Sequence, residues 1–234
     1  RSGDVSPVEA VQASIDRIQK LDGELNAVVT ERFERALDDA AGDIPDGPFK
    51  GVPFILKDLW TSSANEPMHL GNKALKEINY ISPVESDLAR RYREAGFIVV
   101  GRSNTPEFGL VGTTEPESYG PSRNPWNTDY GTGGSSGGAA AAVASGMVPS
   151  ANASDGGGSI RIPAAMCGLV GLKPSRGRVP MGPMQEEWGL SIQHVVCHSM
   201  RDAAGILDAT AIPTMGDGVV APPHGQPYID QVGA

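Results

Sequence analysis

The chain has 234 residues, of which 39% are hydrophobic and 20% are charged, so it is long enough to bury a globular core. Its net charge of −9 repels phosphate backbones and argues against nucleic acid as a partner. No run of residues approaches the ~20 apolar positions that a membrane-spanning helix needs, so no membrane association is expected.

The first predicted helix starts at a strong capping signal. Ser6 is its N-cap, Pro7 takes the first helical position and Glu9 completes a capping box. Gly23 is expected to end the helix. Apolar residues recur at helical spacing between these ends, at Val8, Val11, Ile15 and Ile18.

Strands and helices alternate along the rest of the chain. Short buried strands are expected in "GVPFILKDL", in "FIVVG" (97–101) and in "GLVGLKPS". Further helices are expected from the capping residues 82–85 to Gly96, in the alanine-rich "GGAAAAVASG", and after the capping pair Ser199 and Asp202. This alternation predicts an α/β fold with a sheet covered by helices, followed from Pro213 by an irregular stretch rich in proline and glycine.

The two cysteines, Cys167 and Cys197, lie in the apolar stretches "AAMCGLVG" and "HVVCHSM". Such surroundings favour buried free thiols over a disulfide, and free thiols are typical of a reducing compartment. We therefore expect the protein to be cytoplasmic.

Two stretches rich in glycine and serine stand close together, "GTGGSSGGAAAAVASG" (131–146) and "SDGGGSIRIPA" (154–164). A phosphate-binding loop is excluded because Ala139 stands where that motif needs lysine, and a dinucleotide-binding loop because Ser136 replaces the third glycine. No nucleotide cofactor is therefore expected.

The first stretch also fits the G-x-S-x-G pattern of a serine nucleophile on a tight turn, at residues 133–137. That turn should follow a buried strand, whereas the polar "RNPWNTDYGTG" precedes it. None of the histidines stands in a setting that marks a catalytic base; these are His69, His194, His198 and His224.

A buried lysine can replace histidine as the base for a serine hydroxyl, if desolvation keeps it neutral. Lys57 follows the apolar run "GVPFIL", so its backbone is expected to be buried. The residues alone leave open a second interpretation, a lysine at a strand end that reaches water or pairs with Asp58.

Taken together, the motifs "GVPFILKD", "GGSSGG", "SDGGGSIRIPA" and "CGLVGLKPSRGRVP" resemble the amidase signature family, from about residue 6 to residue 211. The resemblance implies one domain over residues 1–234, built on a mixed sheet covered by helices. It assigns the nucleophile to Ser159, a bridging role to Ser135 after a cis peptide bond, and the base to Lys57. It also assigns the oxyanion hole to the backbone of Gly156, Gly157 and Gly158.

The same resemblance implies an acyl-enzyme mechanism without a metal or a cofactor, in which protons pass between Ser159, Ser135 and Lys57 on one hydrogen-bonded chain. Lys57 is expected to work neutral, with Asp58 turned away from it. The expected partner is a small-molecule amide substrate. Whether the protein forms a homodimer is left open by the sequence.

Two departures from the family pattern stand out. Glycine occupies position 156, where the family usually has a β-branched residue, which is expected to loosen the oxyanion loop. Family members are also longer, so the sequence is expected to lack the C-terminal half of the family fold and to leave an open sheet edge and an exposed apolar face.

The function expected from these motifs is hydrolysis of a carboxylic amide by a free-standing amidase. Two alternatives remain open. One is the A subunit of a tRNA-dependent amidotransferase, although that protein usually reads "SSLDQIGP" near the place of "LSIQHVV" here. The other is a non-catalytic fragment or binding protein.

Overall fold

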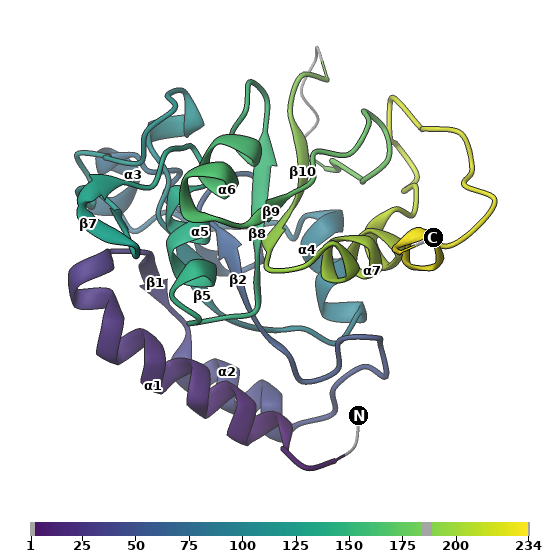
Figure 1. The fold of residues 1–234 in the computed structure, drawn as a ribbon, viewed down its shortest axis with the longest axis horizontal. Helices are drawn as coiled ribbons and strands as arrows, with labels where there is room; N and C mark the ends of the chain where they lie inside the picture. Colours follow the sequence, from purple (N-terminus) through teal and green to yellow (C-terminus); the bar gives the residue numbers. More distant parts are fainter. Residues whose placement is uncertain (1–2, 184–188, 234) are drawn as a thin grey trace.

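The computed structural model describes residues 3–183 and 189–233, and within them a mixed six-stranded sheet forms the centre of the fold (Figure 1). Its strand order is β1-β5-β2-β8-β10-β9. Strand β2 runs parallel to β5 and to β8, and the other neighbours pair antiparallel. The bounds are β1 Val28–Glu31, β2 Pro53–Lys57, β5 Ile98–Ser103, β8 Ser150–Asp155, β9 Val170–Gly171 and β10 Ile192–Cys197. This sheet confirms the predicted α/β class.

Helices cover both faces of this sheet. Since successive side chains of a strand point to opposite faces, they pack in two different cores. On β2, Ile55 packs in one core, whereas Phe54 and Leu56 pack in the other. The Ile55 side is covered by α1 Pro7–Leu25, α2 Phe33–Ala41, α5 Gly137–Ala144 and α6 Arg161–Cys167. The opposite side is covered by α4 Asp87–Glu94 and α7 Met200–Thr210.

Smaller elements lie in the connections between these helices and strands. Two-stranded sheets form from β3 Glu66–Pro67 with β4 Ile81–Ser82, and from β6 Arg123–Asn124 with β7 Asn127–Gly131. The remaining described helices are short: α3 Lys73–Glu77 and the 3₁₀ turns Glu107–Gly109 and Tyr228–Gln231.

Two of the predicted helix starts are confirmed. Ser6 and Glu9 form the capping box of α1, and Ser199 caps α7 by accepting a hydrogen bond from the Asp202 N–H. The end of α1 differs from the prediction, because the helix continues past Gly23 to Leu25 and is closed by Asn26 in the left-handed conformation. Asparagine tolerates this conformation better than most side chains.

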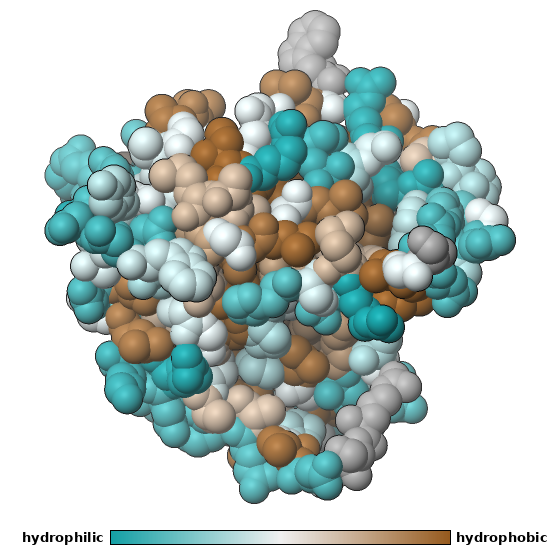
Figure 2. Space-filling view, viewed as in Figure 1, coloured by the Kyte–Doolittle hydropathy of each residue, from teal (hydrophilic) through white to brown (hydrophobic). Residues whose placement is uncertain are grey.

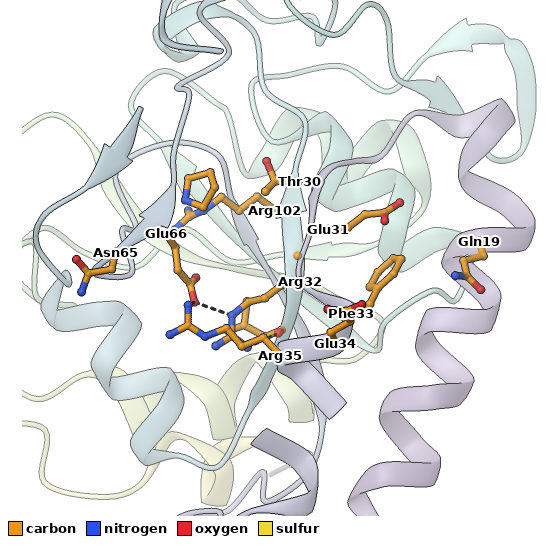
Figure 3. A pocket seen from close by; sticks show the side chains of 13 residues that line it. Gln19, Thr30, Glu31, Arg32, Phe33, Glu34, Arg35, Asn65, Glu66 and Arg102 are labelled. Carbon is orange, nitrogen blue, oxygen red and sulfur yellow. Dashed lines mark hydrogen bonds and ion pairs between the residues drawn. The ribbon is translucent and has the colours of Figure 1, made fainter. Parts of the chain in front are cut away.

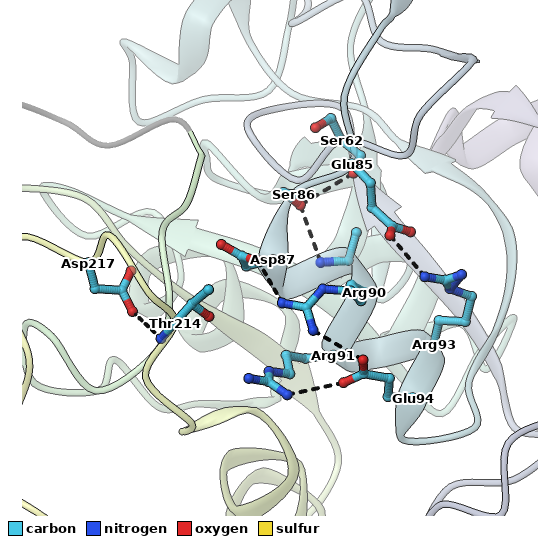
Figure 4. A network of polar contacts seen from close by, with 11 residues as sticks. Ser62, Glu85, Ser86, Asp87, Arg90, Arg91, Arg93, Glu94, Thr214 and Asp217 are labelled. Atoms are coloured by element: carbon cyan, nitrogen blue, oxygen red, sulfur yellow. Dashed lines mark hydrogen bonds and ion pairs between the residues drawn. The ribbon is translucent and has the colours of Figure 1, made fainter.

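The predicted start of α4 is wrong. Its N-cap is Ser86, which accepts a hydrogen bond from the Ala89 N–H, and not Ser82 (Figure 4). Ser82 pairs with Glu66 in the β3–β4 sheet, so its backbone is extended there. A ladder of ion pairs along the helix, from Arg90 with Asp87 at 2.7 Å to Arg91 with Glu94 at 3.1 Å, follows the true start.

The strand expected in "GLVGLKPS" is shorter than predicted. Only Val170 and Gly171 pair, with β10, and both are half-buried at the edge of the described sheet. The strand expected at 97–101 instead extends to Ser103. Cys167 and Cys197 are buried free thiols, as predicted.

Several large apolar side chains are exposed, and two of them, Ile162 and Met166, lie on α6. They include Leu110, Val111, Ile162, Met166 and Leu190. Figure 2 shows apolar side chains gathered over α6 and over the neighbouring strands. A search of the described residues finds no helix with the length and apolar character needed to cross a membrane.

Candidate active site

Lys57 ends strand β2 and is fully buried. Its Nζ donates to Ser135 Oγ at 2.7 Å and to Ser154 Oγ at 2.9 Å. Burial lowers the pKa of Lys57 to about 7, against a smaller opposing effect of the Asp155 carboxylate. A lysine with this pKa is partly neutral near pH 7, so it can accept a proton from a hydroxyl group.

The Asp58 carboxylate is turned away from Lys57, as expected if the lysine works in its neutral form. It accepts hydrogen bonds from the N–H groups of His69 at 2.8 Å and Gly71 at 3.3 Å. Burial raises the pKa of Asp58, and the positive charge of Arg102 opposes the rise. Asp58 therefore fixes the loop at residues 69–71 and is not the partner of Lys57.

The first glycine–serine loop, which runs from residue 131 to residue 138 and includes the first two residues of α5, is packed against its surroundings. Its Gly134–Ser135 peptide bond is cis, as the family resemblance implies. A Cβ atom on Gly134 would lie 2.5 Å from the Thr113 carbonyl oxygen, and one on Gly138 would lie 2.4 Å from the Asn104 backbone nitrogen. The close packing holds Ser135, which is 1% exposed, against Lys57.

The second loop, residues 155–160, is organised around the buried carboxylate of Asp155. This group accepts hydrogen bonds from the N–H groups of Gly158 at 2.7 Å and Ile160 at 3.2 Å, and from the Arg161 guanidinium at 2.9 Å. Burial raises the pKa of Asp155, but these hydrogen bonds outweigh it and leave the pKa below its usual value. A charged carboxylate thus holds the loop that carries Ser159.

Ser159 is half-buried and lies next to the first loop, since its carbonyl oxygen accepts the Ser136 N–H at 3.2 Å. Within residues 3–183 and 189–233, its hydroxyl forms no hydrogen bond that would complete the predicted chain from Lys57 through Ser135. The first link of that chain is present and the second is not. Lys57 Nζ holds the Ser135 hydroxyl, whereas Asp155 holds the second loop through its backbone N–H groups and not through the Ser159 hydroxyl.

The predicted oxyanion hole needs one correction. The N–H of Gly158 already donates to Asp155, so it is not a free donor. The N–H groups of Gly156 and Gly157 make no such contact in the described part of the chain, and Gly157 is exposed. Two of the three predicted donors, the N–H groups of Gly156 and Gly157, therefore have no partner among the described contacts.

Sequence reasoning gave no role to Ser154 or Asp155. Ser154 is the second partner of Lys57 Nζ, and Asp155 both organises the second loop and acts on the charge of Lys57. Both residues stand within the motif "SDGGGSIRIPA", but nothing in the motif itself tells which side chain faces Lys57. That information comes from the parallel pairing of β2 with β8.

A cavity of about 580 Å³ lies elsewhere, between α1, β1 and the start of α2 (Figure 3). It is lined by Arg32, Arg35, Glu66 and Arg102, among others, but not by Lys57 or by any residue of the two glycine–serine loops. Glu66 pairs with Arg32 at 2.7 Å and with Arg35 at 3.2 Å. Arg32 also pairs with Asp39 at 2.7 Å, so Arg32 and Arg35 both already have carboxylate partners.

Comparisons with known proteins agree with this geometry. A family model described as Amidase matches residues 9–231. The 6-aminohexanoate-cyclic-dimer hydrolase of Paenarthrobacter ureafaciens is 41% identical over 232 residues, which cover 97% of this chain and 47% of that protein. The A subunit of the glutamyl-tRNA(Gln) amidotransferase of Thermobifida fusca is 43% identical over 183 residues, which cover 75% of this chain and 36% of that protein.

A solved structure of 6-aminohexanoate cyclic dimer hydrolase superposes with a TM-score of 0.95 at 41% identity. The superposition covers 99% of this chain and 48% of the solved one. The chain therefore spans about half the length of the hydrolase that it matches, in sequence and in structure.

Proposed function

The chain belongs to the amidase family, and we propose that it hydrolyses a carboxylic amide C–N bond with Ser159 as the nucleophile. Ser159 Oγ attacks the amide carbonyl and gives its proton to Ser135, while Ser135 gives its own proton to neutral Lys57. The protons then return along the same path to the leaving amine, which is too basic to depart unprotonated. Water finally hydrolyses the acyl-enzyme.

The observation that carries this proposal is the state of Lys57. A fully buried lysine, 2.7 Å from a serine hydroxyl and with a pKa of about 7, is the base that such a relay requires. Positioned proton transfer of this kind contributes about 10²–10⁴-fold to a rate. The Ser135–Ser159 link forms in this proposal when the free Ser159 hydroxyl turns toward Ser135 as substrate binds.

The backbone N–H groups of Gly156 and Gly157 are proposed to stabilise the developing oxyanion. Each donor aimed at such a charge is worth about 10²–10³-fold in rate. Gly158 supports them indirectly, because its N–H ties the loop to Asp155 at 2.7 Å. No metal or cofactor takes part in this scheme.

The proposed substrate is a small-molecule amide, linear or cyclic, and the buried free thiols favour a cytoplasmic location. A second candidate is the glutaminase step of a tRNA-dependent amidotransferase, which the similarity to such an amidotransferase favours. Release of ammonia from glutamine, measured beside hydrolysis of neutral amides, separates the two candidates.

The test uses a fluorophosphonate probe, whose phosphorus forms a bond to an activated serine Oγ with loss of fluoride. We expect one adduct per chain, located on Ser159 by peptide mass spectrometry, and no adduct in Ser159→Ala. Ser150→Ala serves as the matched control, since Ser150 lies at the far end of β8 from the second loop. A chain that takes up no probe and hydrolyses no amide would instead be a non-catalytic binding protein.

A further inference from the structure

The backbone of Lys57 is held in an unusual way. In the described sheet, β2 pairs with β5 as far as Lys57 and Ser103, but its pairing with β8 is limited to Ile55 and Ala151. On the β8 side the Lys57 N–H therefore has no backbone acceptor. The side chain of Asn152 supplies one, because its Oδ1 accepts the Lys57 N–H at 3.2 Å.

The orientation of the Asn152 carboxamide is fixed by its other contacts. Its Nδ2 donates to the His194 carbonyl oxygen at 3.2 Å and to Tyr92 Oη at 3.3 Å. Tyr92 in turn donates its own proton to the same His194 carbonyl at 3.1 Å. Because both Nδ2 partners need a donor and the Lys57 N–H needs an acceptor, only one placement of oxygen and nitrogen satisfies all three.

Asn152 and Ser154 are alternate residues of β8, so their side chains leave the strand on the same side. Asn152 holds the backbone of Lys57, and Ser154 holds its Nζ at 2.9 Å. Strand β8 therefore binds Lys57 both at its backbone N–H and at its Nζ. Asn152 is itself fully buried, so its contacts do not compete with water.

We propose that Asn152 is a positioning residue of the proton relay, which sets the place of Lys57 by replacing a missing backbone hydrogen bond between β2 and β8. This inference rests on the proposed function of Lys57 as the base. Since a displacement of about 1 Å can cost on the order of 10²-fold in rate, a backbone anchor for the base has catalytic consequences. Asn152 itself touches neither Ser135 nor Ser159 in the described contacts.

The test compares three variants of the full chain in their rate of reaction with the fluorophosphonate probe. Asn152→Ala removes the anchor, and Asn152→Leu removes it while keeping the side-chain volume. Tyr92→Phe is the matched control, because it deletes a buried hydroxyl from the same network and leaves the Asn152–Lys57 contact in place. Thermal unfolding of each variant measures the stability that each change costs.

We expect the rate to fall by about 10- to 100-fold in both Asn152 variants and to stay within about threefold of the starting protein in Tyr92→Phe. If Asn152→Ala fails to fold, Asn152→Leu carries the comparison. Equal losses in Tyr92→Phe and the Asn152 variants, or a loss of stability without a loss of rate in the Asn152 variants, would overturn the proposal.

A starting protein that does not react with the probe would overturn the proposed function. The role of Asn152 would then be tested by measuring the pKa of Lys57. Nuclear magnetic resonance of the lysine side chain follows this titration without any activity. A Lys57 pKa in Asn152→Ala that lies at least about half a unit above that of the starting protein supports the anchor, because a loosened strand admits water. An unchanged pKa overturns it.

Discussion

The two glycine–serine loops look alike in sequence but use glycine for different physical reasons. In the first loop, a Cβ atom on Gly134 or Gly138 would overlap neighbouring backbone at about 2.5 Å. In the second loop, a Cβ on Gly157 would meet nothing within 4 Å, and Gly157 is exposed. The first loop therefore needs glycine for close packing, whereas the second loop is open at Gly157, where the backbone is exposed.

This difference matches the chemistry proposed for each loop. The first loop presses Ser135 against a buried lysine, where exclusion of water keeps the lysine pKa near 7. The second loop offers Ser159 and two free N–H groups at a half-open surface. In this proposal, the first loop serves proton transfer, and the second serves contact with the substrate.

The largest expected effect separates the two serines. Ser159→Ala should lower amide hydrolysis by about 10⁴-fold or more, because it removes the nucleophile. Its unfolding midpoint should stay unchanged, since the Ser159 hydroxyl makes no described hydrogen bond. Ser135→Ala should lower the rate by about 10²–10⁴-fold and also alter stability, because Lys57 loses one of its two hydroxyl partners. Steady-state kinetics with thermal unfolding checks both, and equal rates for the two variants would contradict the division of labour.

The next effect concerns the base. Lys57→Arg should lower the rate by at least about 10²-fold, because a guanidinium stays protonated and accepts no proton. In the unchanged protein the rate should rise with pH through the Lys57 pKa of about 7. A pH–rate profile of kcat measures this rise. Near-normal turnover in Lys57→Arg would mean that the lysine acts only as a positive charge.

Much of this site could be predicted from the sequence, because its motifs are continuous in the chain. Ser135, Ser159 and Lys57 each lie in a short motif, and the apolar run before Lys57 already indicates its burial. Asp155 and Asn152 could not be assigned in the same way. Their roles depend on the pairing of β2 with β8, which joins segments 95 residues apart. The prediction of where α4 begins was wrong for a related reason, since pairing with Glu66 holds Ser82 in an extended conformation.

A third prediction tests the packing of the first loop directly. Gly138 lies in α5, where alanine is favoured over glycine by about 1 kcal/mol on helix propensity alone. Gly138→Ala should nevertheless destabilise the fold by about 3 kcal/mol, because the new Cβ meets three backbone atoms closer than 3.0 Å. Denaturant unfolding measures the change. Gly157→Ala is the matched control in the second loop, with an expected change below about 0.5 kcal/mol.

A smaller change, counted per pH unit, is expected in the free energy of unfolding. The pKa of Lys57 is 10.5 as a reference and about 7 in the fold, so the unfolded chain binds more protons between these values. The unfolding free energy should therefore rise with pH in this range, by about 1.4 kcal/mol per pH unit at most from this group. Below pH 7 both states are protonated and the dependence from Lys57 ends. Unfolding free energies at several pH values check the slope, and Lys57→Met should remove its contribution.

The smallest expected effect lies at Gly156, where a side chain should be accepted. A Cβ atom there would lie 3.8 Å from Leu190 Cγ, an ordinary contact, and Gly156 does not have a positive φ. Gly156→Val should therefore stabilise the protein by about 0.5 kcal/mol, because it restricts the unfolded chain more than the folded one. Its N–H stays in place, so the reaction with the fluorophosphonate probe should change by less than about threefold, well below the loss of one oxyanion donor.

Gly158→Val is the control for this prediction within the same loop. Gly158 has φ +135°, and a Cβ atom would lie 2.7 Å from Ile162 Cδ1, so this variant should be destabilised by about 2 kcal/mol. The loss should extend to the probe reaction, because the Gly158 N–H anchors the loop to Asp155. If instead Gly156→Val destabilised the protein as much as Gly158→Val, the second loop would be as tightly constrained as the first, and the contrast between packing and accessibility would fail at this position.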